Sequence, residues 1–298
     1  MSTELKSISD GIAALARSAE RTVVQVDARR RFPASGIVWS EEGLIVTANH
    51  VVRKDNIHVG LSDGSSLEAT LLGRDPGIDI AVLKVEAEGL SAIDWAPEDE
   101  MNVGEIVLAL GRPGQILQAS LGILSAMGGA RHVPGGGQAS HYIRPDLVMY
   151  PGFSGGPILG ADGRIIGMAT SAFGREGAVA LSRSTVAPLV ADLVKHGSIR
   201  RNYLGVGVQA VQLPAVTVAQ GGQETGVLLN SVKSDSPAER GGLVVGDILI
   251  SLDDESLRDP RDLAVALRAN RADNQVRLQV IRGGEPLEVL VDLGASGE

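Results

Sequence analysis

Hydrophobic positions in the first two thirds of the chain form short runs separated by turn residues. Six of these runs are SGIVWS, GLIVTANHVV, IDIAVLKVE, EIVLALG, GRIIGMATS and GAVALS, and turns such as SEEG, SDGSS and GADG lie between the strands. Short apolar runs at this spacing, with few helix signals, are typical of an antiparallel barrel or sandwich. A break at GRPGQ, residues 111–115, is expected to divide this region into two halves.

Two segments of the same region carry a helical pattern. Near the N-terminus Ile8, Ile12, Leu15 and Ala19 recur at helical spacing, which predicts an amphipathic helix within residues 1–21. A second helix is predicted over STVAPLVADLVKH, with Gly197 as its stop.

The pattern changes after a junction at residues 198–202. YLGVGVQAV, GVLLNSV and DILISLDD read as strands, SPAERGGL as a short helix, and PRDLAVALRAN as a helix beginning at Pro260. NQVRLQVIRGGEPLEVLVDL reads as a hairpin that turns at Gly283-Gly284. We therefore expect an N-terminal helix (1–21), a β-rich domain (22–197) and a small α/β domain (198–295).

Composition removes several classes of function. The 298 residues carry a net charge of −9 and no long basic stretch, which argues against nucleic acid as a partner. There is no cysteine, so disulfides, thiolate metal sites and cysteine nucleophiles are excluded. The histidines outside the motifs below show no metal-site spacing, and we predict no metal and no cofactor; they are His58, His132, His141 and His196.

Membrane and targeting signals are also weak. No segment approaches the roughly 20 apolar residues of a membrane-spanning helix, so no membrane span is predicted. The N-terminal segment lacks the uninterrupted apolar core of a signal peptide, which favours the cytoplasm.

Ser154 lies in PGFSGGP, where five of seven residues are Gly or Pro. The stretch matches G-x-S-x-G, the nucleophile elbow of lipases and esterases. That elbow requires a helix directly after the serine, and Gly-Gly-Pro followed by ILGADGRIIGM predicts strand, turn and strand instead. We therefore reject a lipase or esterase.

A serine nucleophile needs a base, which in turn needs an orienting acid. His50 ends the apolar run of TANH, and Asp79 leads directly into IAVLKV. Desolvating a carboxylate at the mouth of a buried strand is costly unless a partner meets it, and His50 is the candidate partner. Asp75 is a rival acid, although Pro76 and Gly77 place it in a turn.

Taken together, TANH, DIAVL and GFSGGP resemble the motifs of chymotrypsin-like proteases, and the closest likeness is to the HtrA/Deg family. The resemblance runs from about Val23 to the C-terminus. It implies a mainly β fold, with a chymotrypsin-like double β-barrel followed by a small α/β PDZ domain. Related proteins often work in the cell envelope, so the resemblance leaves the compartment open.

The resemblance also implies roles for individual residues. Ser154 attacks the scissile carbonyl, His50 transfers the proton and Asp79 orients the imidazole. The backbone N–H groups of Gly152 and Ser154 form the oxyanion hole. Phe153 departs from the family, which has Asn or Asp before the serine, and this departure favours a loop that is collapsed at rest.

Specificity is assigned by the same resemblance. The S1 pocket is expected along Ala178, Val179, Ala180 and Leu181, where no charged residue would hold Arg or Lys, so small aliphatic P1 residues are predicted. An alternative is that these four residues are only core. Regulatory loops are expected at Met127–His141, at Tyr150 and at Phe173–Glu176.

The C-terminal region resembles a PDZ domain. Its YLGV, which is Tyr203, Leu204, Gly205 and Val206, matches the loop that receives a peptide's C-terminal carboxylate. Leu263 and Leu267, on the helix from Pro260, are expected to line the other side of the peptide groove.

The sequence therefore predicts an ATP-independent serine endopeptidase. Its expected substrates are unfolded or misfolded proteins, its PDZ module binds peptide C-termini, and it forms a homo-oligomer, a trimer or a multiple of one. The alternative is a protease-derived chaperone or adaptor with weak or no catalytic activity, which Phe153 favours.

Overall fold

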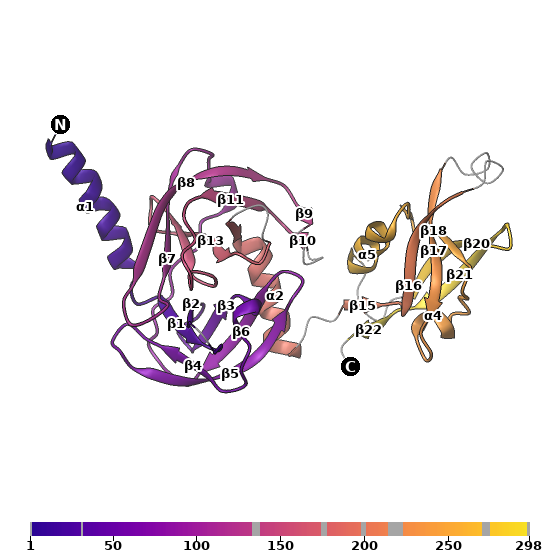
Figure 1. Cartoon of the computed structure of the whole chain (residues 1–298), viewed down its shortest axis with the longest axis horizontal. Helices are drawn as coiled ribbons and strands as arrows, with labels where there is room; N and C mark the ends of the chain where they lie inside the picture. The colour runs from indigo at the N-terminus through magenta and orange to yellow at the C-terminus, as the bar shows by residue number, and fades with distance from the viewer. Residues whose placement is uncertain are drawn as a thin grey trace. The chain divides into compact units, whose positions relative to one another are not determined.

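The computed structural model describes residues 2–30, 32–132, 138–173, 178–197, 201–213, 223–269 and 275–296. The chain divides into two compact units, residues 1–199 and 200–298. In Figure 1 the colour follows the chain from indigo at the N-terminus to yellow at the C-terminus.

The first unit begins with helix α1 (Ser2–Ser18) and contains two closed six-stranded barrels. The first barrel has the strand order β1-β2-β3-β6-β5-β4. Its strands are β1 (Val23–Asp27), β2 (Ala34–Val38), β3 (Leu44–Thr47), β4 (Ile57–Gly60), β5 (Ser66–Asp75) and β6 (Ile80–Val85). The short helix η1 (Asn49–Val51) follows β3 directly.

The second barrel has the order β11-β14-β13-β12-β7-β8. Its strands are β7 (Ile106–Gly111), β8 (Gln118–Gly128), β11 (Tyr142–Asp146), β12 (Pro157–Gly160), β13 (Ile165–Thr170) and β14 (Val179–Leu181). A two-stranded ribbon, β9 (Arg131–His132) with β10 (Gln138–Ala139), joins β8 to β11. The connection between the barrels, residues 86–105, contains η2 (Glu98–Glu100).

The expected break at residues 111–115 is therefore wrong. Gly111 is the last residue of β7, and GRPGQ turns from β7 into β8 inside the second barrel. The two barrels separate instead at residues 86–105, which hold Gly89, Pro97 and several acidic residues. Gly and Pro mark both turns equally, so composition alone could not tell which one ends a barrel.

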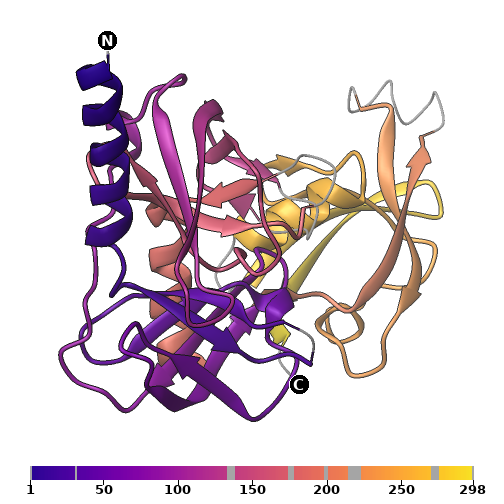
Figure 2. The same cartoon turned by 60° about the vertical axis from the view of Figure 1, so that its left-hand side comes forward.

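Helix α2 (Arg183–His196) follows the second barrel in sequence but lies against strands β5 and β6 of the first, as both views show (Figures 1 and 2). It ends at Gly197, whose φ of +72° is the left-handed conformation that glycine adopts at helix C-termini. Val186, Val190 and Leu193 of α2 join a core cluster that draws on both barrels. This shared core fixes the two barrels against each other.

Helix α1 is only partly packed. Ile12 and Leu15 pack against the shared core, whereas Leu5 and Ile8 are 65% and 56% exposed. The first turns of the helix project beyond the barrels (Figure 1). No helix among the described residues is long and apolar enough to cross a membrane.

Within its described residues, the second unit contains a six-stranded sheet, two helices and its own core. Five strands follow the order β16-β17-β18-β20-β21, β19 pairs with β18, and β15 pairs separately with β22. The strands are β15 (Arg201–Tyr203), β16 (Val206–Gln212), β17 (Thr225–Val232), β18 (Ile248–Leu252), β19 (Glu255–Ser256), β20 (Gln275–Arg282), β21 (Glu285–Asp292) and β22 (Gly294–Ser296). The helices are α4 (Pro237–Arg240) and α5 (Pro260–Ala269). The mainly β fold and the double barrel are confirmed.

Candidate active site

The first barrel supplies a carboxylate and an imidazole that bind each other. His50 Nδ1 lies 2.8 Å from Asp79 Oδ2, and the backbone N–H of His50 donates to Asp79 Oδ1 at 2.8 Å. His50 lies on η1, and Asp79 ends the turn between β5 and β6. An ionised carboxylate only accepts hydrogen bonds, so the neutral imidazole carries its proton on Nδ1 and presents Nε2 as an acceptor.

Asp79 is held from several directions. It is 2% exposed, its backbone φ is +62°, and its carbonyl oxygen accepts the N–H of Asn49 at 3.1 Å. Its Oδ2 also accepts the hydroxyl of Thr170, which ends strand β13 of the second barrel. We predicted that burial of the Asp79 carboxylate would be costly without a partner. The carboxylate in fact accepts three hydrogen bonds, from the backbone N–H and Nδ1 of His50 and from the Thr170 hydroxyl.

The rival acid takes a local role instead. Asp75 Oδ1 accepts the N–H of Gly77 at 2.7 Å, which closes the turn that Pro76 and Gly77 predicted. The imidazole of His50 pairs with Asp79 and not with this side chain.

The second barrel supplies Ser154 from the loop between β11 and β12. Ser154 is 6% exposed, and its hydroxyl lies 3.0 Å from Ser171 Oγ, directly after β13. No hydrogen bond joins Ser154 Oγ to His50, although both residues line one cleft of about 310 Å³. The hydroxyl of Ser154 is thus bonded to Ser171 and not to the imidazole that lines the same cleft.

Two backbone N–H groups beside Ser154 have no acceptor among the described residues. They belong to Gly152, whose φ is +94°, and to Ser154 itself. The surrounding peptide groups are bonded: Phe153 N–H donates to Tyr150 O at 3.1 Å, and Gly155 N–H donates to Ala169 O at 2.8 Å. Two unpaired donors in the lining of the cleft are the arrangement that an oxyanion requires.

Phe153, the unusual residue before the serine, is buried in the interior of the second barrel. It is 0% exposed and meets the ring of Tyr150 edge-on at 5.5 Å between centroids. A Cβ on Gly111 would lie 2.6 Å from this ring. The side chain of Phe153 therefore holds the loop by packing in the core.

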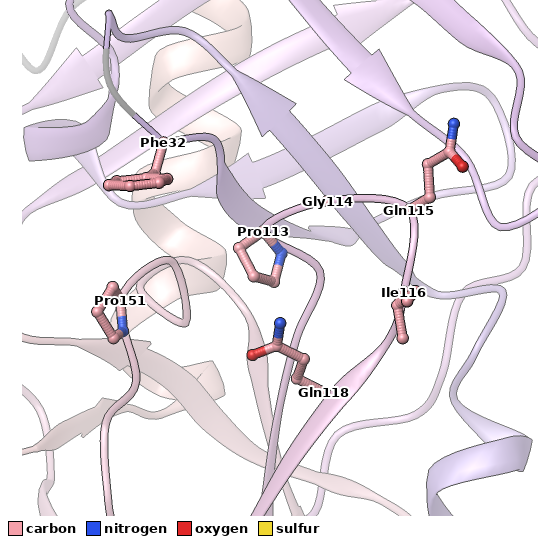
Figure 3. A pocket seen from close by; sticks show the side chains of 7 residues that line it. All are labelled: Phe32, Pro113, Gly114, Gln115, Ile116, Gln118 and Pro151. Carbon is pink, nitrogen blue, oxygen red and sulfur yellow. The ribbon is translucent and has the colours of Figure 1, made fainter.

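A second hollow of about 470 Å³ adjoins the cleft and shares Phe32 and Pro151 with it. Figure 3 shows Phe32, Pro113 and Pro151 around one end, with Ile116 beyond. Phe32 and Ile116 are 60% and 77% exposed. The region beside Ser154 thus offers apolar side chains to solvent.

The residues expected to form the S1 wall lie on and before β14. Ala178, Val179, Ala180 and Leu181 are between 0% and 6% exposed, and the last three pack within the barrel cores. Their part in a specificity pocket stays a prediction. Residues 133–137 and 174–177, which hold parts of two expected regulatory loops, lie outside the described residues.

In the second unit, YLGV forms the turn between β15 and β16. Leu204 O accepts the N–H of Ala238 at 2.9 Å, Gly205 O accepts that of Lys233 at 2.8 Å, and Gly205 has a φ of +84°. The N–H groups of Leu204 and Gly205 have no acceptor within the described part of the chain.

The other residues expected at the peptide groove lie on strands β15 and β16 and on helix α5. Tyr203 ends β15, Val206 begins β16, Leu263 is 3% exposed in the core, and Leu267 packs partly buried against that core. Their contact with a peptide stays a prediction.

Sequence reasoning missed Thr170, Ser171 and Ser35, which all bond to the predicted site residues. Thr170 could have been suspected, since it is a hydroxyl at the end of the apolar run IIGMAT. No local signal distinguishes Ser35, whose hydroxyl bonds to Gly152 O, 117 residues further along the chain.

Known protein families match each of the two units of the chain. The family described as trypsin-like peptidase domain matches residues 34–168, and the PDZ domain family matches residues 202–293. A probable periplasmic serine endoprotease, DegP-like, of Pseudomonas fulva is 38% identical over 267 residues, which cover 87% of this chain and 55% of that protein. The protein of the same name in Brucella suis is 34% identical over 270 residues, covering 88% and 52%.

Among solved structures, the HtrA-type protease AlgW with a decapeptide superposes with a TM-score of 0.78 at 27% identity, covering 96% of this chain and 99% of that one. The chain belongs to the HtrA/Deg family. This HtrA/Deg chain spans about half the length of the curated relatives it matches. The resemblance drawn from TANH, DIAVL and GFSGGP is thereby confirmed.

Proposed function

We propose that this chain is a serine endopeptidase in which Ser154 is the nucleophile, His50 the base and Asp79 the orienting acid. One observation carries the proposal: His50, whose Nδ1 is bonded to the buried Asp79, lines one cleft with Gly152 and Ser154, whose backbone N–H groups have no acceptor among the described residues. A serine hydroxyl, a base and an oxyanion site within one cleft are the groups that acyl transfer needs.

The reaction follows from these positions. Ser154 Oγ attacks the scissile carbonyl as its proton passes to His50 Nε2, and the resulting imidazolium is stabilised by Asp79. The tetrahedral oxyanion accepts hydrogen bonds from Gly152 N–H and Ser154 N–H. His50 then protonates the leaving amine, and water hydrolyses the acyl-enzyme by the same steps in reverse order.

The substrates proposed are unfolded or misfolded protein chains, cleaved without ATP after small aliphatic P1 residues. The exposed Phe32 and Ile116 beside the cleft support this class, because unfolded chains expose the apolar side chains that such a surface attracts. The PDZ unit is proposed to bind peptide C-termini at Leu204 and Gly205, whose N–H groups are available. A homo-oligomer, a trimer or a multiple of one, is proposed from the family alone.

The test is degradation of casein by the wild type and by Ser154→Ala, with mass spectrometry of the cleavage sites. Ser154→Ala removes one oxygen, so thermal melting should scarcely change while turnover falls by about 10⁴-fold or more. Near wild-type turnover in Ser154→Ala would refute the nucleophile, and a cleavage map dominated by Arg or Lys would refute the P1 preference.

A second candidate, a chaperone or adaptor with weak catalysis, is favoured by the hydrogen bond between Ser154 and Ser171. A fluorophosphonate probe, which labels only an activated serine, separates the two. If the endopeptidase proposal holds, the wild type is labelled at Ser154, and Ser171→Ala is labelled about threefold faster because a competing hydrogen bond is gone. Absence of labelling in both proteins favours the adaptor.

A further inference from the structure

Ser35, on strand β2, lies wholly buried where the two barrels meet and is bonded to the loop that carries the nucleophile. Its Oγ is 2.6 Å from Gly152 O and 2.7 Å from the backbone nitrogen of Arg112. Its own backbone N–H donates to Ser154 O at 3.3 Å. One residue of the first barrel thus binds two carbonyls of the serine loop.

The direction of these hydrogen bonds is fixed by the chemistry of the partners. A hydroxyl has one proton to donate and two lone pairs that accept. The N–H of Arg112 can only donate and the carbonyl of Gly152 can only accept, so the proton of Ser35 Oγ points at Gly152 O. The backbone amide of Arg112, directly after β7, therefore fixes the orientation of the hydroxyl.

This hydrogen bond holds a segment that would otherwise rotate easily. Gly152 has no side chain to restrict it, and its φ is +94°. The peptide plane that follows Gly152 is held at both edges, since its carbonyl accepts the Ser35 hydroxyl and its N–H, that of Phe153, donates to Tyr150 O. Fixing this plane orients the N–H groups on either side of it, which are the two unpaired donors.

The rest of the serine loop also packs directly on Ser35. A Cβ on Gly155 would lie 2.2 Å from Ser35 O, and one on Gly156 would lie 3.2 Å from Ser35 Cβ. Thr47 Oγ1 donates to Ser35 O at 2.7 Å, which ties this position to β3, the strand that leads to His50. Ser35 is therefore held by the barrel that carries the base.

We propose that Ser35 is a positioning residue that sets the two oxyanion donors through its hydrogen bond to Gly152 O. The inference rests on the proposed peptidase function. Loss of the hydroxyl leaves Gly152 O without its donor and lets the glycine rotate its N–H away from the cleft. The reaction then loses transition-state stabilisation while binding of the substrate's side chains is retained.

The experiment compares the full-length wild type with Ser35→Ala in steady-state cleavage of one peptide. We expect kcat to fall by about 10- to 100-fold, somewhat less than for direct removal of an oxyanion donor, and KM to stay within about twofold. A peptide boronate, whose tetrahedral adduct places an oxygen in the oxyanion hole, should lose affinity by the same factor as kcat/KM. The matching unreactive peptide amide should bind equally to both proteins.

Thr22→Val is the matched control for the loss of a buried hydroxyl. Thr22 is also 0% exposed, and its Oγ1 donates to Ser91 O at 2.7 Å, away from the serine loop. This variant should melt at a lower temperature and keep kcat within about twofold.

Ser35→Thr, which retains a hydroxyl, should keep most of the wild-type kcat where it folds. If Ser35→Ala is too unstable to assay, Ser35→Cys, a weak donor of similar size, replaces it with the same expectation.

The outcomes separate this inference from the function it rests on. No turnover by the wild type, or full turnover by Ser154→Ala, refutes the peptidase itself. With an active wild type, a folded Ser35→Ala that keeps its kcat, or that loses boronate and amide affinity equally, overturns the positioning role. The positioning role is supported if Ser35→Ala loses kcat and boronate affinity but keeps its affinity for the amide, while Thr22→Val keeps its kcat.

Discussion

Asp79 combines a strained backbone with the most heavily bonded carboxylate of the site. A φ of +62° is unfavourable for most residues, although Asp and Asn tolerate it better than others. Asp79→Asn should therefore keep the turn, but its amide nitrogen can donate to Nδ1 and select the tautomer with a proton on Nε2. We expect kcat to fall by about 10⁴-fold, measured with a peptide substrate.

Asp75→Asn is the matched control, because Asp75 is equally buried at 4% exposure and four residues away. Its turnover should stay within about threefold of the wild type. If Asp79→Asn and Asp75→Asn lower kcat equally, the loss comes from a disturbed turn and not from the His50–Asp79 pair.

At this scale the sequence identified the residues that we propose to react, but not the residues that are hydrogen-bonded to them. His50, Asp79 and Ser154 lie in three motifs whose residue types are unusual for ordinary strands. Ser35 and Thr170 are single hydroxyls within apolar strands, and their importance comes from contacts to residues 117 and 91 positions away. Only the folded chain shows such pairings.

At the scale of elements, the strands and helices followed the hydrophobic pattern closely, while the end of the first barrel did not. Both GRPGQ and residues 86–105 carry turn signals, and the choice between them depends on which strands close each barrel. Barrel closure is a long-range property that no local run of residues encodes.

In the PDZ unit, Asp247 ties β18 to β20 through Arg282. Burial by itself raises the pKa of the Asp247 carboxyl, but hydrogen bonds from Arg282 and from Val244 N–H, together with the arginine charge, lower the pKa below its ordinary value. A lowered folded-state pKa contributes stability that is present above the unfolded value, near 3.9, and lost as pH falls through the folded value.

Asp247→Asn should therefore reduce the free energy of unfolding of residues 200–298 at pH 7 by about 2 kcal/mol, the usual worth of a hydrogen bond to a charged group. Its loss of stability on acidification below about pH 4 should also be smaller than that of the wild type. Chemical denaturation at pH 3 to 7 measures both effects. Asp254→Asn, at an exposed turn, is the control, and a wild-type-like pH profile in Asp247→Asn would refute the assignment.

For the molecule as a whole, each unit closes a hydrophobic core from its own residues. A chain that ends at residue 199 should therefore fold alone, give a cooperative melt and react with the fluorophosphonate probe at Ser154. Processing of long substrates should change, because the proposed peptide groove is absent. An unfolded circular dichroism spectrum of residues 1–199 would show that the protease unit depends on the PDZ unit.

The proposed catalytic groups are divided between the two barrels, and this has a consequence during synthesis. His50 and Asp79 leave the ribosome with the first barrel, whereas Ser154, the two N–H groups proposed to bind the oxyanion and Thr170 belong to the second, which closes with β14. Helix α2, synthesised later still, completes the core that joins them. A nascent chain therefore cannot hold the complete proposed site before α2, which ends at His196, has been made, so we expect the proposed peptidase to be inactive up to that point.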